Sequence, residues 1–191
     1  MESRLQLYNR MLATRRELKQ EFVNEASRAI QKRVLMMEEF RTALRIGLYT
    51  PYDNEVRTDV LFTEGDKNRK ELYYGAVDEK QDRLLFHRIY ELKDLNLDAD
   101  GIYEPTGAIR KLRDVNTLET LVVPGVAFDL HGGRLGFGKG LYDKCLLEFR
   151  GRRIALAYEF QIVPELPVAA RGQKVDWIVT ESRVIHCMRK R

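Results

Sequence analysis

The sequence predicts an α/β domain of three layers, in which helices cover both faces of a mostly parallel sheet. Segments with helical spacing alternate with short apolar, strand-like runs along the chain. The sequence has no low-complexity linker and no internal repeat, and 191 residues suit one domain with a sizeable core. Such alternation favours parallel strands joined by helical crossovers. We therefore expect a single Rossmann-like domain over residues 1–191.

The N-terminal segment is predicted to form two helices. Apolar residues recur at helical spacing over residues 5–22 and again over residues 26–40. Asn24 is suited to cap the second helix, and Glu25 would favour its first turn.

The rest of the chain is predicted to alternate between strands and short helices. Thr58 is expected to start a helix that runs to residue 62, and residues 141–149 form another helix. Ligands of such sheets bind beyond the carboxyl ends of the strands, so loops 50–58, 101–107 and 124–140 should lie together. The predicted strands are residues 45–50, 71–77, 83–89, 117–123, 153–158, 175–180 and 184–187.

Composition indicates a soluble cytoplasmic protein. Hydrophobic residues make up 44% of the chain and charged residues 32%, which is ordinary for a globular domain. No apolar run approaches the ~18 residues of a membrane span, and the polar N-terminus does not resemble a signal peptide. Cys145 and Cys187 form no metal or redox motif, and Cys145 is expected to be a buried, reduced thiol.

The net charge of +4 is concentrated in residues 1–45, which hold ten Lys or Arg and six Asp or Glu. Acidic residues interrupt the basic ones throughout this segment, as on a solvated helix face. No nucleic-acid-binding motif accompanies the charge, so we expect no nucleic-acid partner.

The most informative stretch is residues 121–143, LVVPGVAFDLHGGRLGFGKGLYD. A β-type run breaks at Pro124, a glycine-rich segment follows, and a helix is predicted from Leu141. Glycines allow backbone N–H groups to approach an anion, and the helix N-terminus adds partial positive charge. Arg134 and Lys139 supply cations, and Asp143 is a carboxylate of the kind that Mg²⁺ on a nucleotide requires.

The segment nearly matches the phosphate-binding pattern G-x-x-x-x-G-K-[ST]. Gly133, Gly138 and Lys139 fit, but Gly140 stands where the pattern has a hydroxyl residue that coordinates Mg²⁺. The chain is therefore not a standard P-loop NTPase, and Asp143 would serve the metal instead. The alternative interpretation is a glycine-rich surface loop with solvated charges.

Residues 124–143 resemble the signature of the 5-formyltetrahydrofolate cyclo-ligase (5,10-methenyltetrahydrofolate synthetase) family, PG-x-x-F-D-x-x-G-x-R-L-G-x-G-x-G-x-Y-D. Weaker matches occur at YTPYDNEVRT (49–58), GIYEP (101–105), ALAYEFQIVPELP (155–167) and VDWIVTE (175–181). The resemblance implies a three-layer α/β enzyme of one-carbon metabolism. Its substrates would be ATP and a reduced folate, and it would need Mg²⁺.

The resemblance also implies roles for individual residues. Arg134 and Lys139 would bind the ATP phosphates and act with Tyr142 as catalytic residues, while Asp143 would hold Mg²⁺. The folate would contact Glu55, Phe128 and Tyr142. The residues expected around ATP are Arg134, Leu135, Gly136, Phe137, Gly138, Lys139, Gly140, Leu141 and Tyr142.

Glu55 has two interpretations on physical grounds. A carboxylate beyond the first strand can accept hydrogen bonds from an amino-pterin ring, and an acid near a helix start is stabilised by the helix dipole. The similarity of NEVRT to the family's D-E-[IV]-x-T favours the ligand role.

The implied reaction is ATP- and Mg²⁺-dependent cyclisation of 5-formyltetrahydrofolate to 5,10-methenyltetrahydrofolate, with release of ADP and phosphate. Two alternatives are a diverged folate- or nucleotide-binding relative with little activity, and a small-molecule kinase or ATPase.

The chain departs from the family pattern at three places. The N-terminal K-x-x-L-R is replaced by a segment with Arg4 and Arg10 at other spacings, and Leu141 replaces an aromatic residue. Gly172 replaces an aspartate that helps to hold Mg²⁺, which leaves Asp143 with water, or with Asp176 after a local shift.

Overall fold

The structure is a computed structural model that describes residues 2–98, 101–105, 112, 114–138, 140–167 and 172–187. Its described residues form a seven-stranded sheet of order β12-β11-β9-β6-β1-β2-β3. The five central strands are parallel, and β3 and β12 are antiparallel edge strands. This confirms the predicted α/β class. The strands are β1 (Arg45–Leu48), β2 (Glu71–Asp78), β3 (Arg83–Arg88), β6 (Thr120–Val123), β9 (Arg152–Leu156), β11 (Trp177–Val179) and β12 (Val184–His186).

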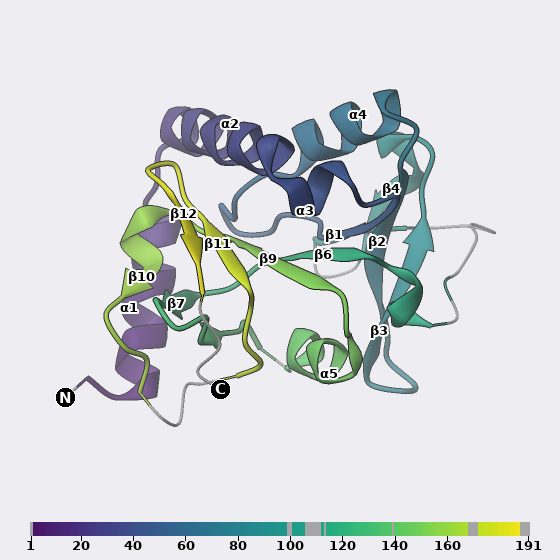
Figure 1. The fold of residues 1–191 in the computed structure, drawn as a ribbon. Coiled ribbons are helices and arrows are strands. Elements are labelled where there is room, and N and C mark those ends of the chain that lie inside the picture. The colour runs from purple at the N-terminus through teal and green to yellow at the C-terminus, as the bar shows by residue number, and fades with distance from the viewer. Residues whose placement is uncertain are drawn as a thin grey trace.

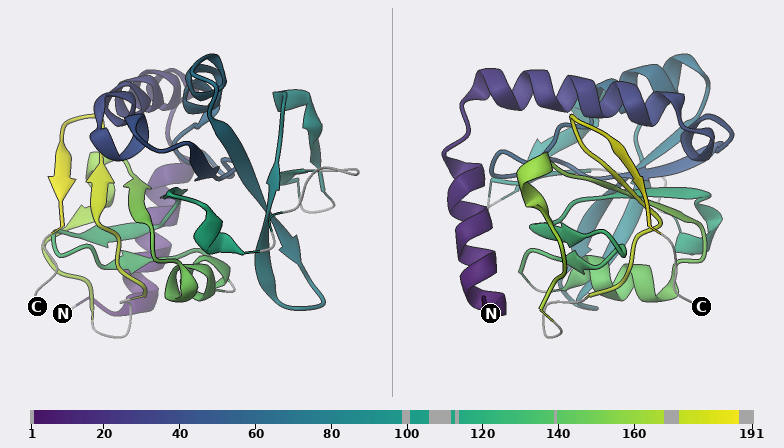
Figure 2. Two further views of the ribbon diagram at one scale, coloured as in Figure 1. Left: turned by 45° about the vertical axis from the view of Figure 1, so that its right-hand side comes forward. Right: turned by 60° about the vertical axis from the view of Figure 1, so that its left-hand side comes forward.

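Helices cover both faces of this sheet. Helices α2 (Gln20–Met36), α3 (Glu38–Arg41) and α4 (Asp59–Lys67) lie above it in Figure 1, and α5 (Leu141–Glu148) lies below. Helix α1 (Arg4–Arg16) stands at one side of the molecule, as the right-hand view of Figure 2 shows. Short 3₁₀ helices occur at η1 (Leu92–Asp94), η2 (Val115–Thr117) and η3 (Glu159–Gln161).

The sheet separates two hydrophobic cores because successive strand residues point to opposite faces. In β6, Val122 packs with Ile30 and Phe62 of the upper helices, whereas Leu121 and Val123 pack on the α5 side. Burial of these apolar faces is the dominant stabilising term of the fold.

The predicted boundary between the first two helices is wrong. Lys19 is the N-cap of α2, so Asn24 lies inside that helix and does not cap it. The reason is that the buried stripe of α2 already begins at Val23 and continues through Ile30 and Val34. The second helix therefore begins before the position that the capping signal indicated.

The first half of the glycine-rich segment is a buried hairpin. Strands β7 (Ala127–Asp129) and β8 (Arg134–Leu135) pair antiparallel, and β10 (Ile162–Val163) extends them to a three-stranded sheet. This sheet packs with Leu7 and Met11 of α1 in a third core. A further pair, β4 (Leu95–Leu97) and β5 (Tyr103–Pro105), is antiparallel. The sequence predicted neither of these small sheets.

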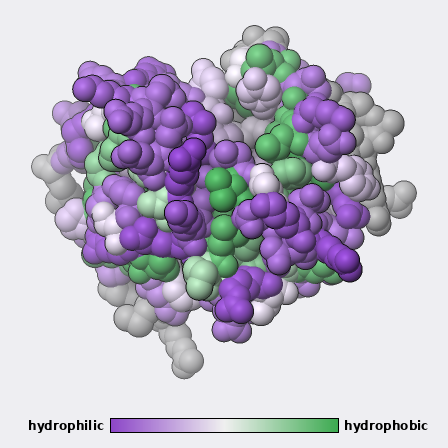
Figure 3. All heavy atoms as spheres, turned by 90° about the horizontal axis from the view of Figure 1, so that it is seen from above, coloured by the Kyte–Doolittle hydropathy of each residue, from purple (hydrophilic) through white to green (hydrophobic). Residues whose placement is uncertain are grey.

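Seen from above, the molecule is mainly hydrophilic, with hydrophobic atoms in a band through the middle and in a second group toward the upper right (Figure 3). This agrees with the solvated helix face expected from the mixed charges of residues 1–45. Within the described parts of the chain, no helix is long and apolar enough to cross a membrane.

Candidate functional site

A cavity opens beyond the carboxyl ends of β1 and β6 and beside the C-terminal half of β2. The three predicted loops meet there, represented by Glu55, Glu104 and Gly136, and this confirms that the topology brings them to one edge. Residues 106–107 of the second loop lie outside the described residues. The lining consists of Tyr49, Thr50, Tyr52, Glu55, Gly75, Val77, Leu84, Ile102, Glu104, Pro124, Gly125, Arg134, Gly136, Phe137, Gly140, Leu141 and Tyr142.

The second half of the glycine-rich segment borders the cavity with open backbone. A Cβ on Gly136 would lie 2.9 Å from Nη2 of Arg134, so only glycine lets the guanidinium pass so closely. Gly140 has φ of +71° and is the N-cap of α5, a backbone conformation that glycine adopts without strain. Lys139, the predicted phosphate ligand, lies outside the described residues.

Arg134 is held rigidly at the wall of the cavity. Its side chain is buried, with 1% of the residue exposed. Nη2 donates to Oδ1 of Asp143 at 2.8 Å, and Nη1 donates to the carbonyl of Pro124 at 3.1 Å. Nε donates no hydrogen bond within the described structure. The predicted cation thus reaches the site, but as the partner of a carboxylate.

Asp143, the predicted metal ligand, accepts two hydrogen bonds with one of its carboxylate oxygens. Its Oδ1 accepts from Arg134 and also from the backbone N–H of Gln173 at 3.0 Å. The side chain keeps 32% exposure. No group of three or more His, Cys, Asp or Glu suited to a metal occurs among the described residues. One accessible carboxylate fits a Mg²⁺ ion whose other ligands are phosphate oxygens and water.

The positions proposed to complete the metal shell are occupied otherwise. Oδ2 of Asp176 accepts the backbone N–H of Arg153 at 3.0 Å, which ties β11 to β9. A Cβ on Gly172 would lie 2.3 Å from Oδ1 of Asp143 and 3.0 Å from the carbonyl oxygen of Arg134. Gly172 therefore allows the Arg134–Asp143 pair to form, and a side chain there has no room.

Glu55 lies on the opposite wall, at the end of a tight turn. Its Oε2 accepts the backbone N–H of Tyr52 at 3.2 Å, and its Oε1 lies 3.4 Å from Nη1 of Arg15. The side chain is 10% exposed. Burial raises the pKa of the carboxyl to about 7, while the positive charge of Arg15 acts against this rise. Helix α4 begins at Asp59, so Glu55 lies outside the first helical turn, and the helix-start interpretation is wrong.

Aromatic side chains complete the cavity wall. The guanidinium carbon of Arg134 lies over the ring of Tyr142, 5.9 Å from the ring centre. Burial raises the pKa of the Tyr142 hydroxyl. Phe137 is 43% exposed and packs between Tyr8 of α1 and Tyr52, with ring centres 6.3 and 6.1 Å apart.

Four of the predicted ligand residues that the structure describes do not line the cavity, namely Phe128, Leu135, Gly138 and Asp143, and the first two are buried. Phe128 is fully buried in the core, and its ring fills the space in which Gly125 lacks a side chain. Leu135 is buried against α1, and its carbonyl accepts the N–H of Val126 within the hairpin. Their predicted roles in substrate and ATP binding are corrected to packing roles. The motif alone could not separate ligand residues from those that shape the hairpin.

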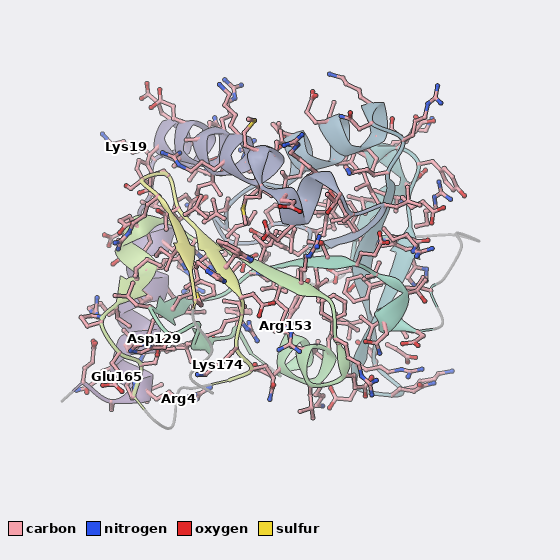
Figure 4. The ribbon with its side chains drawn as sticks, viewed as in Figure 1. Arg4, Lys19, Asp129, Arg153, Glu165 and Lys174 are labelled. Carbon is pink, nitrogen blue, oxygen red and sulfur yellow. The ribbon has the colours of Figure 1, made fainter. Side chains whose placement is uncertain are left out.

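Asp129 belongs to the same motif and also has a structural role (Figure 4). Its carboxylate accepts the N–H groups of His131, Gly133 and Leu166 at 2.9, 2.8 and 3.2 Å. These bonds close the turn of the hairpin and tie it to the segment after β10. They satisfy a carboxylate that is buried.

The buried cation Arg15 was missed by sequence reasoning. It lies four and eight residues after Met11 and Leu7, on the same buried stripe of α1. Its burial could have been predicted from the sequence, because this charged residue stands in register with an apolar stripe of the helix. By contrast, Arg10 forms a surface ion pair with Glu2 at 2.8 Å, and Arg4 begins the helix at its other end.

The fold and the site define an α/β protein with a glycine-rich segment and a buried carboxylate facing one cavity. Comparison with known proteins then gives the family. The model of the 5-formyltetrahydrofolate cyclo-ligase family matches residues 1–181, and the chain belongs to this family.

Several relatives resemble the chain over most of its length. A probable 5-formyltetrahydrofolate cyclo-ligase of Schizosaccharomyces pombe is 29% identical, covering 88% of this chain and 90% of the relative. The 5-formyltetrahydrofolate cyclo-ligase of Haemophilus influenzae is 31% identical over 75% of this chain and 79% of its own. The solved 5,10-methenyltetrahydrofolate synthetase of Aquifex aeolicus has a TM-score of 0.86 and 33% identity, covering 98% and 94% of the two chains.

Proposed function

We propose that this protein catalyses the ATP- and Mg²⁺-dependent cyclisation of 5-formyltetrahydrofolate to 5,10-methenyltetrahydrofolate, with release of ADP and phosphate. The observation that carries the proposal is the convergence of Glu55 and the segment around Gly136 and Gly140 on one cavity. Membership of the cyclo-ligase family supplies the reaction class.

In the proposed reaction, the formyl oxygen attacks the γ-phosphorus of ATP, and the bond to the leaving ADP breaks. The neighbouring arylamine nitrogen then attacks the activated formyl carbon and gives up its proton, and phosphate leaves with the former formyl oxygen and takes up that proton. Phosphoryl transfer needs little covalent chemistry from the protein, so positioning and charge neutralisation carry the catalysis.

The cavity residues and the adjoining glycine-rich segment fit a reaction in which the protein positions the substrates and neutralises charge. Glu55 accepts hydrogen bonds from the amino-pterin edge, because a carboxylate offers two acceptors to paired N–H groups. Arg134 and Lys139 neutralise charge on the transferred phosphoryl group, and backbone N–H groups near Gly138 and Gly140 hold the phosphates. Tyr142 and Phe137 both line the cavity. Tyr142 would contact the folate and the nucleotide where they meet, and Phe137 would offer its exposed ring to a planar group.

Asp143 would hold Mg²⁺ together with phosphate oxygens. When bound, the ion neutralises phosphate charge and orients the leaving group. Asp143 also fixes Arg134 through Oδ1, so one carboxylate orients a cation of the protein and serves the metal.

The test is to incubate the protein with ATP, Mg²⁺ and 5-formyltetrahydrofolate and to follow the methenyl product by its absorbance. One ADP and one phosphate should appear for each methenyl group formed. ADP release that does not require the folate would indicate an ATPase. Tight folate binding without product would indicate a diverged relative, and either result would overturn the proposal.

A further inference from the structure

The geometry points to Arg15 as a positioning residue of the folate site: it holds the turn that presents Glu55 and supplies the countercharge of its carboxylate. This inference rests on the proposed folate role of Glu55. It concerns a residue of α1 that lies outside the cavity wall.

The turn that carries Glu55 is strained. Asp53 and Asn54 have φ of +49° and +59°, in the left-handed region that residues other than glycine seldom adopt. The N–H of Glu55 donates to the carbonyl of Tyr52 at 3.0 Å, so both central residues of a tight turn are left-handed. Such a backbone persists only where its surroundings hold it.

The C-terminal turn of α1 provides those surroundings. Nε of Arg15 donates to the carbonyl of Asp53 at 2.8 Å. The side-chain amide of Asn54 donates back to the carbonyls of Arg15 and Leu18 at 3.1 and 3.3 Å. Tyr158 adds a hydrogen bond from its hydroxyl to the carbonyl of Asn54 at 3.0 Å. The helix end and the turn are therefore one unit.

Arg15 also faces the functional carboxylate itself. Its Nη1 lies 3.4 Å from Oε1 of Glu55, and only 1% of its side chain is exposed. Its Nη2 donates no hydrogen bond in the described part of the chain and lies 3.7 Å from Oδ2 of Asp53. A guanidinium this close and this buried acts electrostatically on the nearest buried carboxylate, Glu55.

The charge state of Glu55 depends on this arrangement. Burial raises the pKa of Glu55 to about 7, and Arg15 is the largest influence that lowers it. Removing that cation should raise the pKa further, so the carboxyl would be neutral at pH 7 and would lose one of its acceptors. The other groups that act electrostatically with Glu55 are Asp53, Arg134, Tyr49 and Tyr142.

The experiment measures the affinity for 5-formyltetrahydrofolate without ATP between pH 6 and pH 9. The variants are Arg15→Met, Arg15→Lys and the control Arg16→Met. Arg16 is the next residue, has a side chain that is 59% exposed, and pairs with Asp53 at 2.9 Å. The control thus makes the same change on the same turn of α1 without touching Glu55.

We expect Arg15→Met to weaken folate binding about fivefold or more at pH 7 and to move the pH midpoint of binding upward by about one unit or more. Affinity should recover as the pH rises toward 9, since Glu55 then ionises without help. ATP affinity should not change. Arg15→Lys, which keeps the charge, should retain a midpoint near that of the wild type, and Arg16→Met should behave as the wild type.

The double variant Arg15→Met/Glu55→Gln separates positioning from a general structural role. If Arg15 acts through Glu55, the double variant binds folate no more weakly than Glu55→Gln alone. An equal loss at every pH, or a further loss in the Glu55→Gln background, would overturn the inference. If Arg15→Met does not fold, an Arg15→Lys midpoint that equals the wild-type value supports it, and a midpoint raised as far as one unit overturns it. A wild-type protein that binds no folate would refute the proposed function instead.

Discussion

The ion pair between Arg134 and Asp143 should contribute to stability before any ligand is bound. Asp143→Ala would leave the guanidinium of Arg134 buried, at 1% exposure, without its carboxylate partner. Breaking a buried pair from one side costs about 3–5 kcal/mol. Because the side chain of Asp143 retains 32% exposure, water can replace part of the lost interaction, and we expect about 3 kcal/mol.

Urea denaturation without Mg²⁺ or nucleotide measures this loss. With a slope of about 2 kcal/mol per molar urea, the midpoint should fall by roughly 1.5 M. Glu148→Ala is the matched control, since it removes an exposed acid from the same helix. Asp143→Asn should lose less, because its amide oxygen can still accept from Arg134 and from the N–H of Gln173.

An Asp143→Ala midpoint equal to those of the wild type and Glu148→Ala would refute a stabilising role of the Arg134–Asp143 pair. A second check is the variant Arg134→Met/Asp143→Ala. Replacing both members should recover stability relative to Asp143→Ala, because no buried charge is left alone. If Asp143→Ala is destabilised as expected, the metal role of Asp143 has to be tested with the milder variant Asp143→Asn. The measurement is then the Mg²⁺ concentration needed for activity.

Other predictions concern the two walls of the cavity. Glu55→Gln should weaken the binding of 5-formyltetrahydrofolate by roughly tenfold or more, because hydrogen bonds to a charged group contribute about 1.5–3 kcal/mol. Calorimetry without folate should find the ATP affinity unchanged, and equal losses for both ligands would contradict the folate role. Burial raises the pKa of Glu55 from 4.5 to about 7, so the folded state retains a proton that the unfolded state loses. The free energy of unfolding should therefore fall by at most about 3 kcal/mol as pH rises from 4.5 through 7, and this fall should vanish in Glu55→Gln. Lys139→Ala should weaken ATP binding and turnover together, and an unchanged ATP affinity and rate would remove Lys139 from the site. Gly172→Asp should lower the melting temperature without lowering the Mg²⁺ requirement, because its Cβ would collide with Asp143; a stable variant that needs less Mg²⁺ would show that the site can open.

Local patterns in the sequence determined the class of fold. Short apolar runs and helical spacing depend only on which residues face a core, so they located β1, β2, β3, β6, β9 and α5 to within a few residues. Parallel strands place their carboxyl ends at one edge, and this rule alone predicted that Glu55 would meet the glycine-rich segment.

The tertiary structure decided what individual motif residues do. Phe128, Leu135 and Asp129 stand in the same glycine-rich stretch as Gly136 and are equally prominent in the sequence, yet they belong to a buried hairpin. Helix α1 covers the hairpin at Leu135, and Phe128 packs into the core on the α5 side of the main sheet. The packing partners of that hairpin come from the beginning of the chain, more than a hundred residues away, and no local pattern encodes them.

The setting of Glu55 likewise depends on contacts that are distant in sequence. Its nearest cation, Arg15, lies 40 residues earlier and meets it only because α1 ends beside the turn at Asp53. The sequence by itself therefore determined the family of folds and which segments meet at the site. Only the tertiary structure decided burial, ion pairing and the pKa of Glu55, because these depend on how distant segments exclude water and bring charges together.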